Sequence, residues 1–107
     1  MTAEAQRQLA SLPHAVLLLA PGQRLAAANP AAEQFLGQSF RRLQDRELGS
    51  LLRFAEQRLA QRLSETDAHL SARATVVNVR GQRERHVDVT VAPVIDRPGW
   101  QVLTLHD

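Results

Sequence analysis

Residues Arg24–Gly37, RLAAANPAAEQFLG, change from strand character to helix character at a single dipeptide, Asn29-Pro30. A residue before proline is disfavoured in the α region. Asn is a favoured N-cap because its side-chain oxygen accepts a free N–H of the first turn, and proline suits the first helical position. Gly37 can take the left-handed conformation that closes a helix. The stretch therefore predicts a strand over Arg24–Ala28, followed by a helix that ends at Gly37.

The apolar run Ala15–Ala20 lies just upstream of this stretch. Its length favours a strand over a helix, and its composition indicates that both faces are covered. Pro21-Gly22 separates it from Arg24–Ala28 and is a turn pair, since proline presets one dihedral angle and glycine accepts a positive φ. We therefore expect a β-hairpin whose second strand runs directly into a helix.

The rest of the chain divides into a helical part and a strand part. Leucines and alanines along Glu47–Leu63 recur at helical spacing and predict a second helix. The last third changes to a period of two residues, which predicts strands over Arg73–Arg80, Arg83–Val94 and Trp100–His106. Both faces of Trp100–His106 are fairly apolar, so the pattern does not say which one is buried.

This order predicts an α+β fold with a five-stranded antiparallel sheet and helices on one of its faces, provided that the two groups of strands meet in one sheet. A further helix is predicted over residues 1–12, ahead of a domain over residues 13–107. Ala5, Leu9 and Leu12 form a narrow apolar stripe on that helix. The stripe suits packing on its own domain or contact with a second copy in a homodimer.

Composition excludes several classes of function. The chain has 107 residues, which is the size of one domain, and it contains no cysteine. Disulfides, thiol catalysis and a cysteine–flavin adduct are therefore excluded. All 13 basic residues are arginines, and they are scattered along the chain, with four aromatic residues in total. No basic stripe or stacking surface for nucleic acid follows from this pattern.

The longest apolar run is far too short to span a bilayer, and the N-terminus lacks the basic and apolar regions of a secretory signal. We therefore expect a cytoplasmic protein without a membrane segment. The serines lie outside any nucleophile-elbow pattern, and no phosphate loop or dinucleotide fingerprint is present. We expect no catalytic site, no metal site and no cofactor. His86 and Asp88 share one strand face, but two ligands do not make a metal site.

Apolar side chains of several elements are expected to meet between the sheet and the helices. They either fill one another as core, which their periodicity favours, or line a pocket for a small ligand. The candidates for lining this pocket are Phe35, Leu36, Leu51, Phe54, Ala55, Leu59, Val77, Val89 and Val91. Asn29 likewise has two interpretations, as a helix cap or as a ligand contact, and the capping role is favoured.

The order of elements, with Asn-Pro-Ala-Ala at the strand-to-helix junction, resembles a PAS domain from about Leu12 to Asp107. Within that superfamily the chain is most similar to the N-terminal sensor domain of NtrB-type nitrogen-regulation histidine kinases. Three stretches carry this narrower likeness, and the third is the most specific. They are Leu12–Leu18 (LPHAVLL), Ala28–Phe35 (ANPAAEQF) and Val87–Leu105 (VDVTVAPVIDRPGWQVLTL).

The resemblance implies a PAS fold and a regulatory role without catalysis. Such kinases are cytoplasmic homodimers that phosphorylate a response regulator, and a PII signalling protein switches them from kinase to phosphatase. Their phospho-accepting helix and ATP-binding domain follow the PAS domain and are not present in this chain. We therefore expect one domain of a larger protein, without kinase activity of its own.

Two alternatives stay open: a small-ligand-binding PAS sensor domain of another signalling protein, and a PAS-fold interaction domain of an enzyme or transcription factor. The resemblance also places His69 near the position of the axial ligand in haem-binding PAS domains. Haem would in addition need a roomy apolar pocket.

Overall fold

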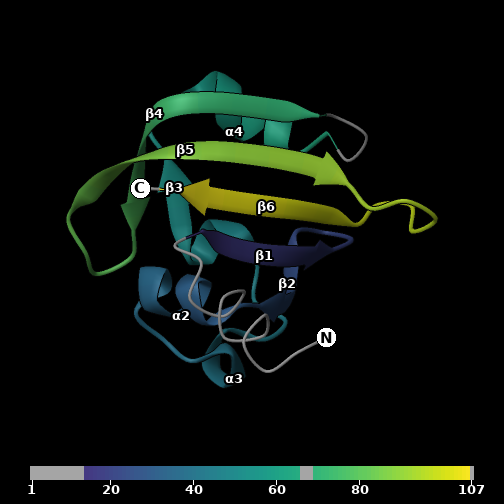
Figure 1. Cartoon of the computed structure of the whole chain (residues 1–107), viewed down its shortest axis with the longest axis horizontal. Helices are drawn as coiled ribbons and strands as arrows, with labels where there is room; N and C mark the ends of the chain where they lie inside the picture. Colours follow the sequence, from purple (N-terminus) through teal and green to yellow (C-terminus); the bar gives the residue numbers. More distant parts are fainter. Residues whose placement is uncertain (1–13, 66–68, 107) are drawn as a thin grey trace, which may run out of the picture.

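The computed structural model describes residues 14–65 and 69–106. The predicted helix at residues 1–12, with Ala5, Leu9 and Leu12, lies outside the described residues. In these described residues, six strands and four short helical segments follow one another (Figure 1). Their bounds are β1 Ala15–Ala20, β2 Arg24–Ala28, α2 Pro30–Leu36, α3 Phe40–Leu43, the 3₁₀ helix η1 Leu48–Ser50, β3 Leu52–Phe54, α4 Gln57–Leu63, β4 Leu70–Val79, β5 Glu84–Pro93 and β6 Gln101–His106.

All six described strands form one antiparallel sheet in the order β2-β1-β6-β5-β4-β3. The two groups of strands meet at β1 and β6, where Leu17 lies opposite Leu103. The first described strand, β1, therefore pairs with the last described strand, β6, and this pairing joins the two groups into one sheet. Strands β4, β5, β6 and β1 cross the front of the view in Figure 1, and α4 lies behind them. The predicted α+β class with one antiparallel sheet is confirmed.

The predicted helix over Glu47–Leu63 is wrong in its first half, and this changes the strand count from five to six. Leu52–Phe54 forms β3, which pairs with the C-terminal end of β4, and the helix α4 occupies only Gln57–Leu63. Leu48, Leu51 and Leu52 are all buried. Their helix-like spacing arises because a 3₁₀ turn and an edge strand both direct leucines toward the same core, and strand pairing overrides the local preference.

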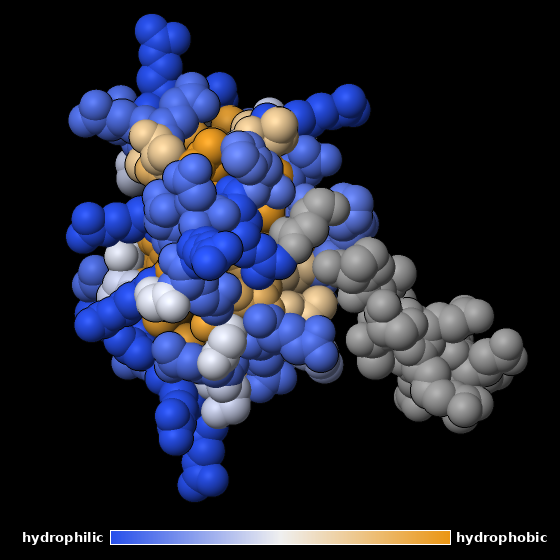
Figure 2. Space-filling model, turned by 90° about the vertical axis from the view of Figure 1, so that its left-hand side faces the viewer, coloured by the Kyte–Doolittle hydropathy of each residue, from blue (hydrophilic) through white to orange (hydrophobic). Residues whose placement is uncertain are grey.

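The core lies between the sheet and the helices. Alternate residues of β1, β5 and β6 point into it, as in Leu17, Val89 and Leu103, which are fully buried. Strand β6 buries the face that carries Gln101, Leu103 and Leu105. Figure 2 shows a largely hydrophilic surface on one side of the molecule, with apolar residues visible between the polar ones. Burial of this leucine- and valine-rich layer is the main source of stability.

Asn29 lies between β2 and α2 in the chain, and its side chain also forms hydrogen bonds to β1. It is the N-cap of α2, and its Oδ1 accepts hydrogen bonds from the backbone N–H of Ala32 at 2.9 Å and of Val16 at 3.0 Å. Its Nδ2 donates to the carbonyl of His14 at 2.9 Å. The backbone N–H of Asn29 also donates to the carbonyl of Val16 at 3.2 Å. One amide side chain therefore extends the β1 ladder and starts α2.

The helix that Asn29 begins has a defined end. Gly37 takes φ 72° and donates its N–H to the carbonyls of Glu33 and Gln34. A side chain at Gly37 would approach the Gln82 Nε2 atom to 2.9 Å, so both the conformation and the space favour glycine.

Replacing Asn29 with alanine is expected to lower the free energy of unfolding by about 2 kcal/mol, because two backbone donors lose their acceptor and the His14 carbonyl loses its donor. Urea denaturation followed by circular dichroism measures the change. The matched control is Asn29→Asp, which keeps both acceptor bonds and should cost less than about 1 kcal/mol. A change below about 0.5 kcal/mol for Asn29→Ala would contradict this role.

Candidate functional site

The residues predicted to line a pocket are brought together between the sheet and the helices, with one exception. Ala55 is exposed. Phe54 is half-buried and packs against the edge of the core. The remaining seven belong to the buried cluster: Phe35, Leu36, Leu51, Leu59, Val77, Val89 and Val91. In the described structure these side chains pack together as one core, and contact with a ligand stays a prediction.

The C-terminal end of α4 is held by two glutamine side chains. Nε2 of Gln23 donates to the carbonyl of Leu63 at 2.9 Å, and Nε2 of Gln101 donates to the same carbonyl at 3.1 Å. Gln101 also donates to the carbonyl of Glu65 at 3.4 Å. These carbonyls belong to the end of a helix, where no intrahelical donor is available. Gln101 thereby joins α4 to β6.

Gln101 is only 1% exposed, which is unusual for glutamine. Both of its donor hydrogens are used, so its burial is compensated. Sequence pattern alone does not single out Gln101 as a functional residue. The alternation of the strand does place Gln101 on the same face as Leu103 and Leu105. A polar residue on a buried face requires hydrogen-bond partners, and this is the sequence feature that could have pointed to Gln101.

The C-terminal end of α2 is held in a similar way by β5 and the turn before it. Nε2 of Gln82 donates to the carbonyl of Phe35 at 3.3 Å. The guanidinium of Arg85 lies over the ring of Phe35, 4.3 Å from its centroid. A cation over an aromatic face is attracted by the ring quadrupole. Each of the two longer helices is therefore linked to a strand in the second half of the sheet.

A hollow of about 260 Å³ lies beside the C-terminal ends of α2 and α3, near the edge of the sheet where β3 pairs with β4. It combines apolar and polar side chains, including two arginines. Its lining residues are Leu36, Gln38, Leu43, Arg46, Ser50, Leu51 and Arg80. A neighbouring hollow of about 420 Å³ shares Ser50, Leu51 and Arg80 and adds Arg53. The arginines come from three separate segments, and sequence spacing alone did not relate them.

The face of the sheet opposite the helices carries a patch of small and apolar side chains. Leu18 of β1 lies opposite Ala27 of β2 on one side and opposite Val102 of β6 on the other. Val102 in turn lies opposite Ala92 of β5. Leu18, Val102 and Ala92 are half-buried and Ala27 is exposed. We call these four residues the outer patch.

Histidines gather at one end of the same outer face. The rings of His14 and His106 lie edge to face, with their centroids 4.2 Å apart. Asp88 lies opposite His106 in the sheet, and its Oδ1 accepts a hydrogen bond from the backbone N–H of Ala74 at 3.0 Å. His86 and His69 are exposed. Within residues 14–65 and 69–106, no group of three histidine or carboxylate side chains is placed to bind a metal.

No helix in the described part of the chain is long and apolar enough to cross a membrane.

Comparison with protein families gives one match that spans most of the chain. Residues 9–105 match the family model described as the PAS fold. A comparison with curated protein sequences finds no significant match.

Solved structures with the same architecture cover the chain almost completely. The chain is 25% identical to the PAS domain of nitrogen regulation protein NR(II) from Vibrio parahaemolyticus, with a TM-score of 0.74 and 99% coverage of both chains. It is 14% identical to a domain of a sensory box sensor histidine kinase/response regulator from Geobacter sulfurreducens, with a TM-score of 0.69, covering 98% of this chain and 93% of that one.

A third similar structure is the E. coli DhaR(N)–DhaL complex. The identity is 21% and the TM-score 0.71, with coverage of 98% of this chain and 37% of the other. At these lower identities the Geobacter and E. coli structures show a shared fold alone.

Replacing Gln101 with methionine, which has a similar length and no strong donor, is expected to loosen the end of α4. The Glu65 carbonyl then loses the amide donor of Gln101, and the Leu63 carbonyl keeps only Gln23. We expect α4 to lose about 1.4 kcal/mol of local stability, which corresponds to roughly tenfold faster amide hydrogen exchange. The acceleration is expected at the amides of residues 60–63 and is measured by NMR.

The control is Gln23→Met, which leaves Gln101 in place as a donor to Leu63. It should accelerate exchange in α4 less than Gln101→Met does. Equal exchange rates in Gln101→Met and the unmodified chain would show that this glutamine does not hold the helix.

Proposed function

Because the chain belongs to the PAS family, we propose that it is the regulatory sensor domain of a two-component, nitrogen-regulation histidine kinase. The observation that carries this proposal is the likeness to the PAS domain of nitrogen regulation protein NR(II), which extends over 99% of both chains at 25% identity. The domain itself is non-catalytic. Its part is to hold two copies together and to pass a change in packing to the domains that follow.

The outer patch is the proposed contact between two copies. It lies at the junction of β1 and β6, and β1 begins directly after the segment that carries the predicted stripe Ala5, Leu9 and Leu12. A twofold pair would bury Leu18 and Val102 against their counterparts, and closed twofold dimers are the commonest assembly. Apolar side chains at the centre of a patch with polar neighbours are typical of such interfaces.

The contacts between helices and strands provide a route for the signal. Gln101 joins the end of α4 to β6, and Gln82 joins the end of α2 to the turn before β5. A displacement of either helix therefore acts on the central strands, whose opposite face carries the outer patch. A signal can change this equilibrium only by binding or stabilising one arrangement more strongly than the other.

The partners in the full-length protein follow from the same proposal. A PII signalling protein and a response regulator would act on the kinase domains in the cytoplasm, rather than on this domain. A small-ligand-binding sensor domain of another signalling protein is the second candidate. The arginine-lined hollow favours it, because it is a space with convergent polar groups.

Introducing a charge at the centre of the outer patch should separate the dimer. In Leu18→Glu two like charges would be buried against each other, and we expect a monomer at tens of micromolar by analytical ultracentrifugation, with the circular dichroism spectrum unchanged. Ile95→Glu is the matched control, because Ile95 is 86% exposed in the loop between β5 and β6. An unmodified chain that is already monomeric, or a Leu18→Glu variant that stays dimeric, would refute the interface.

In the full-length protein, the nitrogen-regulation kinase assignment predicts phosphorylation of a histidine after addition of radiolabelled ATP, and transfer of that phosphate to an aspartate of the response regulator. Leu18→Glu should lower the initial rate at least fivefold, whereas Ile95→Glu should leave it unchanged. A full-length protein that dimerises through the outer patch but has no such phosphotransfer would place the domain in another class of signalling protein.

A further inference from the structure

Two adjoining hollows form a groove along η1 and β3, at the edge of the sheet. The first has a volume of about 230 Å³ and lies between η1, β3 and α4. Its lining residues are Gln23, Leu48, Gly49, Leu52, Arg53, Phe54, Ala60 and Leu63. The second is the hollow of about 420 Å³ described above, which shares Gly49, Leu52 and Arg53 with the first and continues to Asn78 and Arg80. We call the first the anchor hollow and the two together the β3 groove.

The anchor hollow presents apolar surface to solvent. Phe54 is half-buried and Ala60 is exposed, so both contribute accessible carbon atoms to its lining. A closed cavity of about 150 Å³ holds a benzene ring, whereas pockets for whole ligands usually exceed about 300 Å³. The volume of about 230 Å³ therefore suits one aromatic or leucine side chain better than a complete cofactor.

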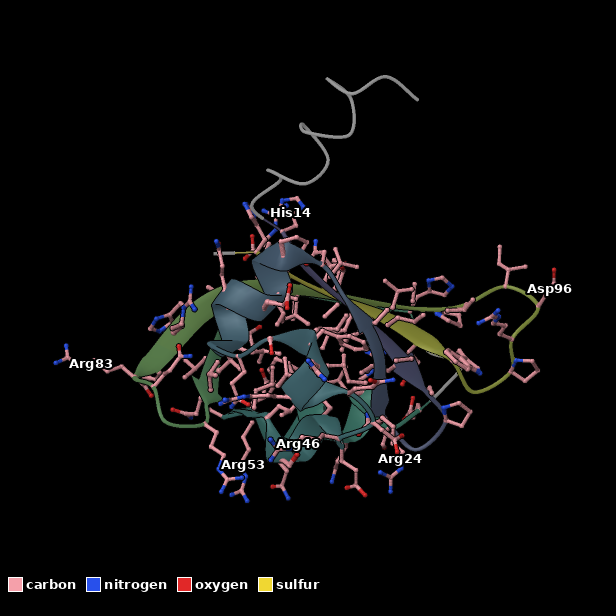
Figure 3. All side chains as sticks on the ribbon, turned by 90° about the horizontal axis from the view of Figure 1, so that it is seen from below. His14, Arg24, Arg46, Arg53, Arg83 and Asp96 are labelled. Carbon is pink, nitrogen blue, oxygen red and sulfur yellow. The ribbon has the colours of Figure 1, made fainter. Side chains whose placement is uncertain are left out.

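The rest of the β3 groove is positively charged. Arg53 lies where the two hollows meet, Arg80 lines the second, and both are exposed. No carboxylate lines either hollow, and within residues 14–65 and 69–106 neither guanidinium forms an ion pair. Figure 3 shows Arg46 and Arg53 on the side of the molecule that lies opposite His14. Positive groups beside an apolar hollow favour a partner that is acidic and carries an apolar side chain.

A polypeptide fits this pattern better than a nucleic acid does. Arg24, next to the lining residue Gln23 in sequence, is neutralised by Glu47 at 3.6 Å, so the positive charge does not continue along the whole face. A phosphate backbone carries charge at short regular intervals and requires a continuous basic track. Phe54 is the one aromatic residue that lines the groove, which is too few for a stacking platform. A polypeptide can instead place carboxylates opposite Arg53 and Arg80 alone.

We propose that the β3 groove docks an acidic segment of a partner protein. An aromatic or leucine side chain of the segment occupies the anchor hollow, and neighbouring carboxylates pair with Arg53 and Arg80. A buried anchor supplies most of the binding energy of such a contact, and guanidinium–carboxylate pairs fix its orientation. Leu63 lines the anchor hollow, and its carbonyl accepts from Gln23 and Gln101. The docked segment therefore contacts the end of α4 that is joined to β6.

NMR titration of the isotopically labelled chain with a blocked synthetic peptide of the sequence Glu-Asp-Phe-Asp-Glu tests the proposal. We expect shifts of the Phe54 ring signals, the Ala60 methyl signal and the Nε–H signal of Arg53. A peptide with alanine in place of its phenylalanine should bind at least about fivefold more weakly, because the anchor is lost. A peptide with amides in place of all four carboxylates should also bind at least about fivefold more weakly, because the charged hydrogen bonds are lost.

Variants of the chain test the same two features. Ala60→Glu fills the anchor hollow with a negative charge and should weaken binding at least about tenfold, whereas Ala60→Ser keeps the hollow open and should bind like the unmodified chain. Arg53→Gln should weaken binding at least about threefold. Arg83→Gln is its matched control, since it removes the same charge from an exposed residue that Figure 3 shows extending from one end of the molecule. If Ala60→Glu alters the amide spectrum throughout, Arg53→Gln decides.

Several results would overturn the proposal. One is the absence of shifts at about 5 mM peptide, several times a weak millimolar dissociation constant. Equal binding of the phenylalanine and alanine peptides would remove the anchor, and equal weakening by Arg83→Gln and Arg53→Gln would indicate net charge alone. Tighter binding of a single-stranded oligonucleotide to the same residues would assign the groove to nucleic acid. Binding is measured on the chain itself, so the result is independent of the kinase assignment.

Discussion

The structure depends on the side-chain amide of Asn29, which forms hydrogen bonds to a strand and to a helix at the same time. Oδ1 of Asn29 accepts from the backbone of Val16 in β1 and of Ala32 in α2, so the end of the hairpin and the start of the helix are held at the same atom. Pro30 adds a fixed φ at the first helical position. Because the chain turns here from the sheet to the layer behind it, the position of α2 relative to β1 follows from these bonds.

The sheet separates two surfaces with different chemistry. On the helix side, Gln101 and Gln82 fasten the ends of α4 and α2, and the arginine-lined hollow adjoins the end of α2. On the outer side, Leu18 and Val102 form an apolar patch across the β1–β6 pair. In such a domain, a displacement of the helices on one face of the sheet can alter the position of side chains on the other face, because β5 and β6 carry residues of both faces. This arrangement is what the proposed role as a sensor domain requires.

The parts of the fold that could be predicted are those where the local signal and the final environment agree. Asn29-Pro30 carries its own cap and start signal, and the alternation of valines in β5 matches a sheet with one buried face. The segment Leu52–Phe54 was misread because its leucines continue a helical spacing, while its strand conformation depends on pairing with β4, far away in sequence. The local hydrophobic pattern contains no information about pairing with a strand that is distant in sequence.

The candidate site shows the same division. The burial of apolar residues such as Val77 and Val89 follows from periodicity, which determines the face they occupy, while their contact with a ligand stays a prediction. The polar residues could not be identified from the sequence, because their roles depend on contacts between segments that are far apart in it. Gln101 acquires its role only when Leu63 is placed beside it, and Arg46 and Arg80 become neighbours of one hollow only after η1 and β3 fold between them.

The central claim is that two copies of this domain meet through the outer face of the β1–β6 pair, opposite the helices that receive the signal. Isotope-filtered NOE spectroscopy on a mixture of labelled and unlabelled chains tests it most directly, because it records contacts between copies only. We expect intermolecular NOEs from the methyl groups of Leu18 and Val102. Intermolecular NOEs confined to residues of α2, α3 or α4, or none at all from the outer face, would contradict it.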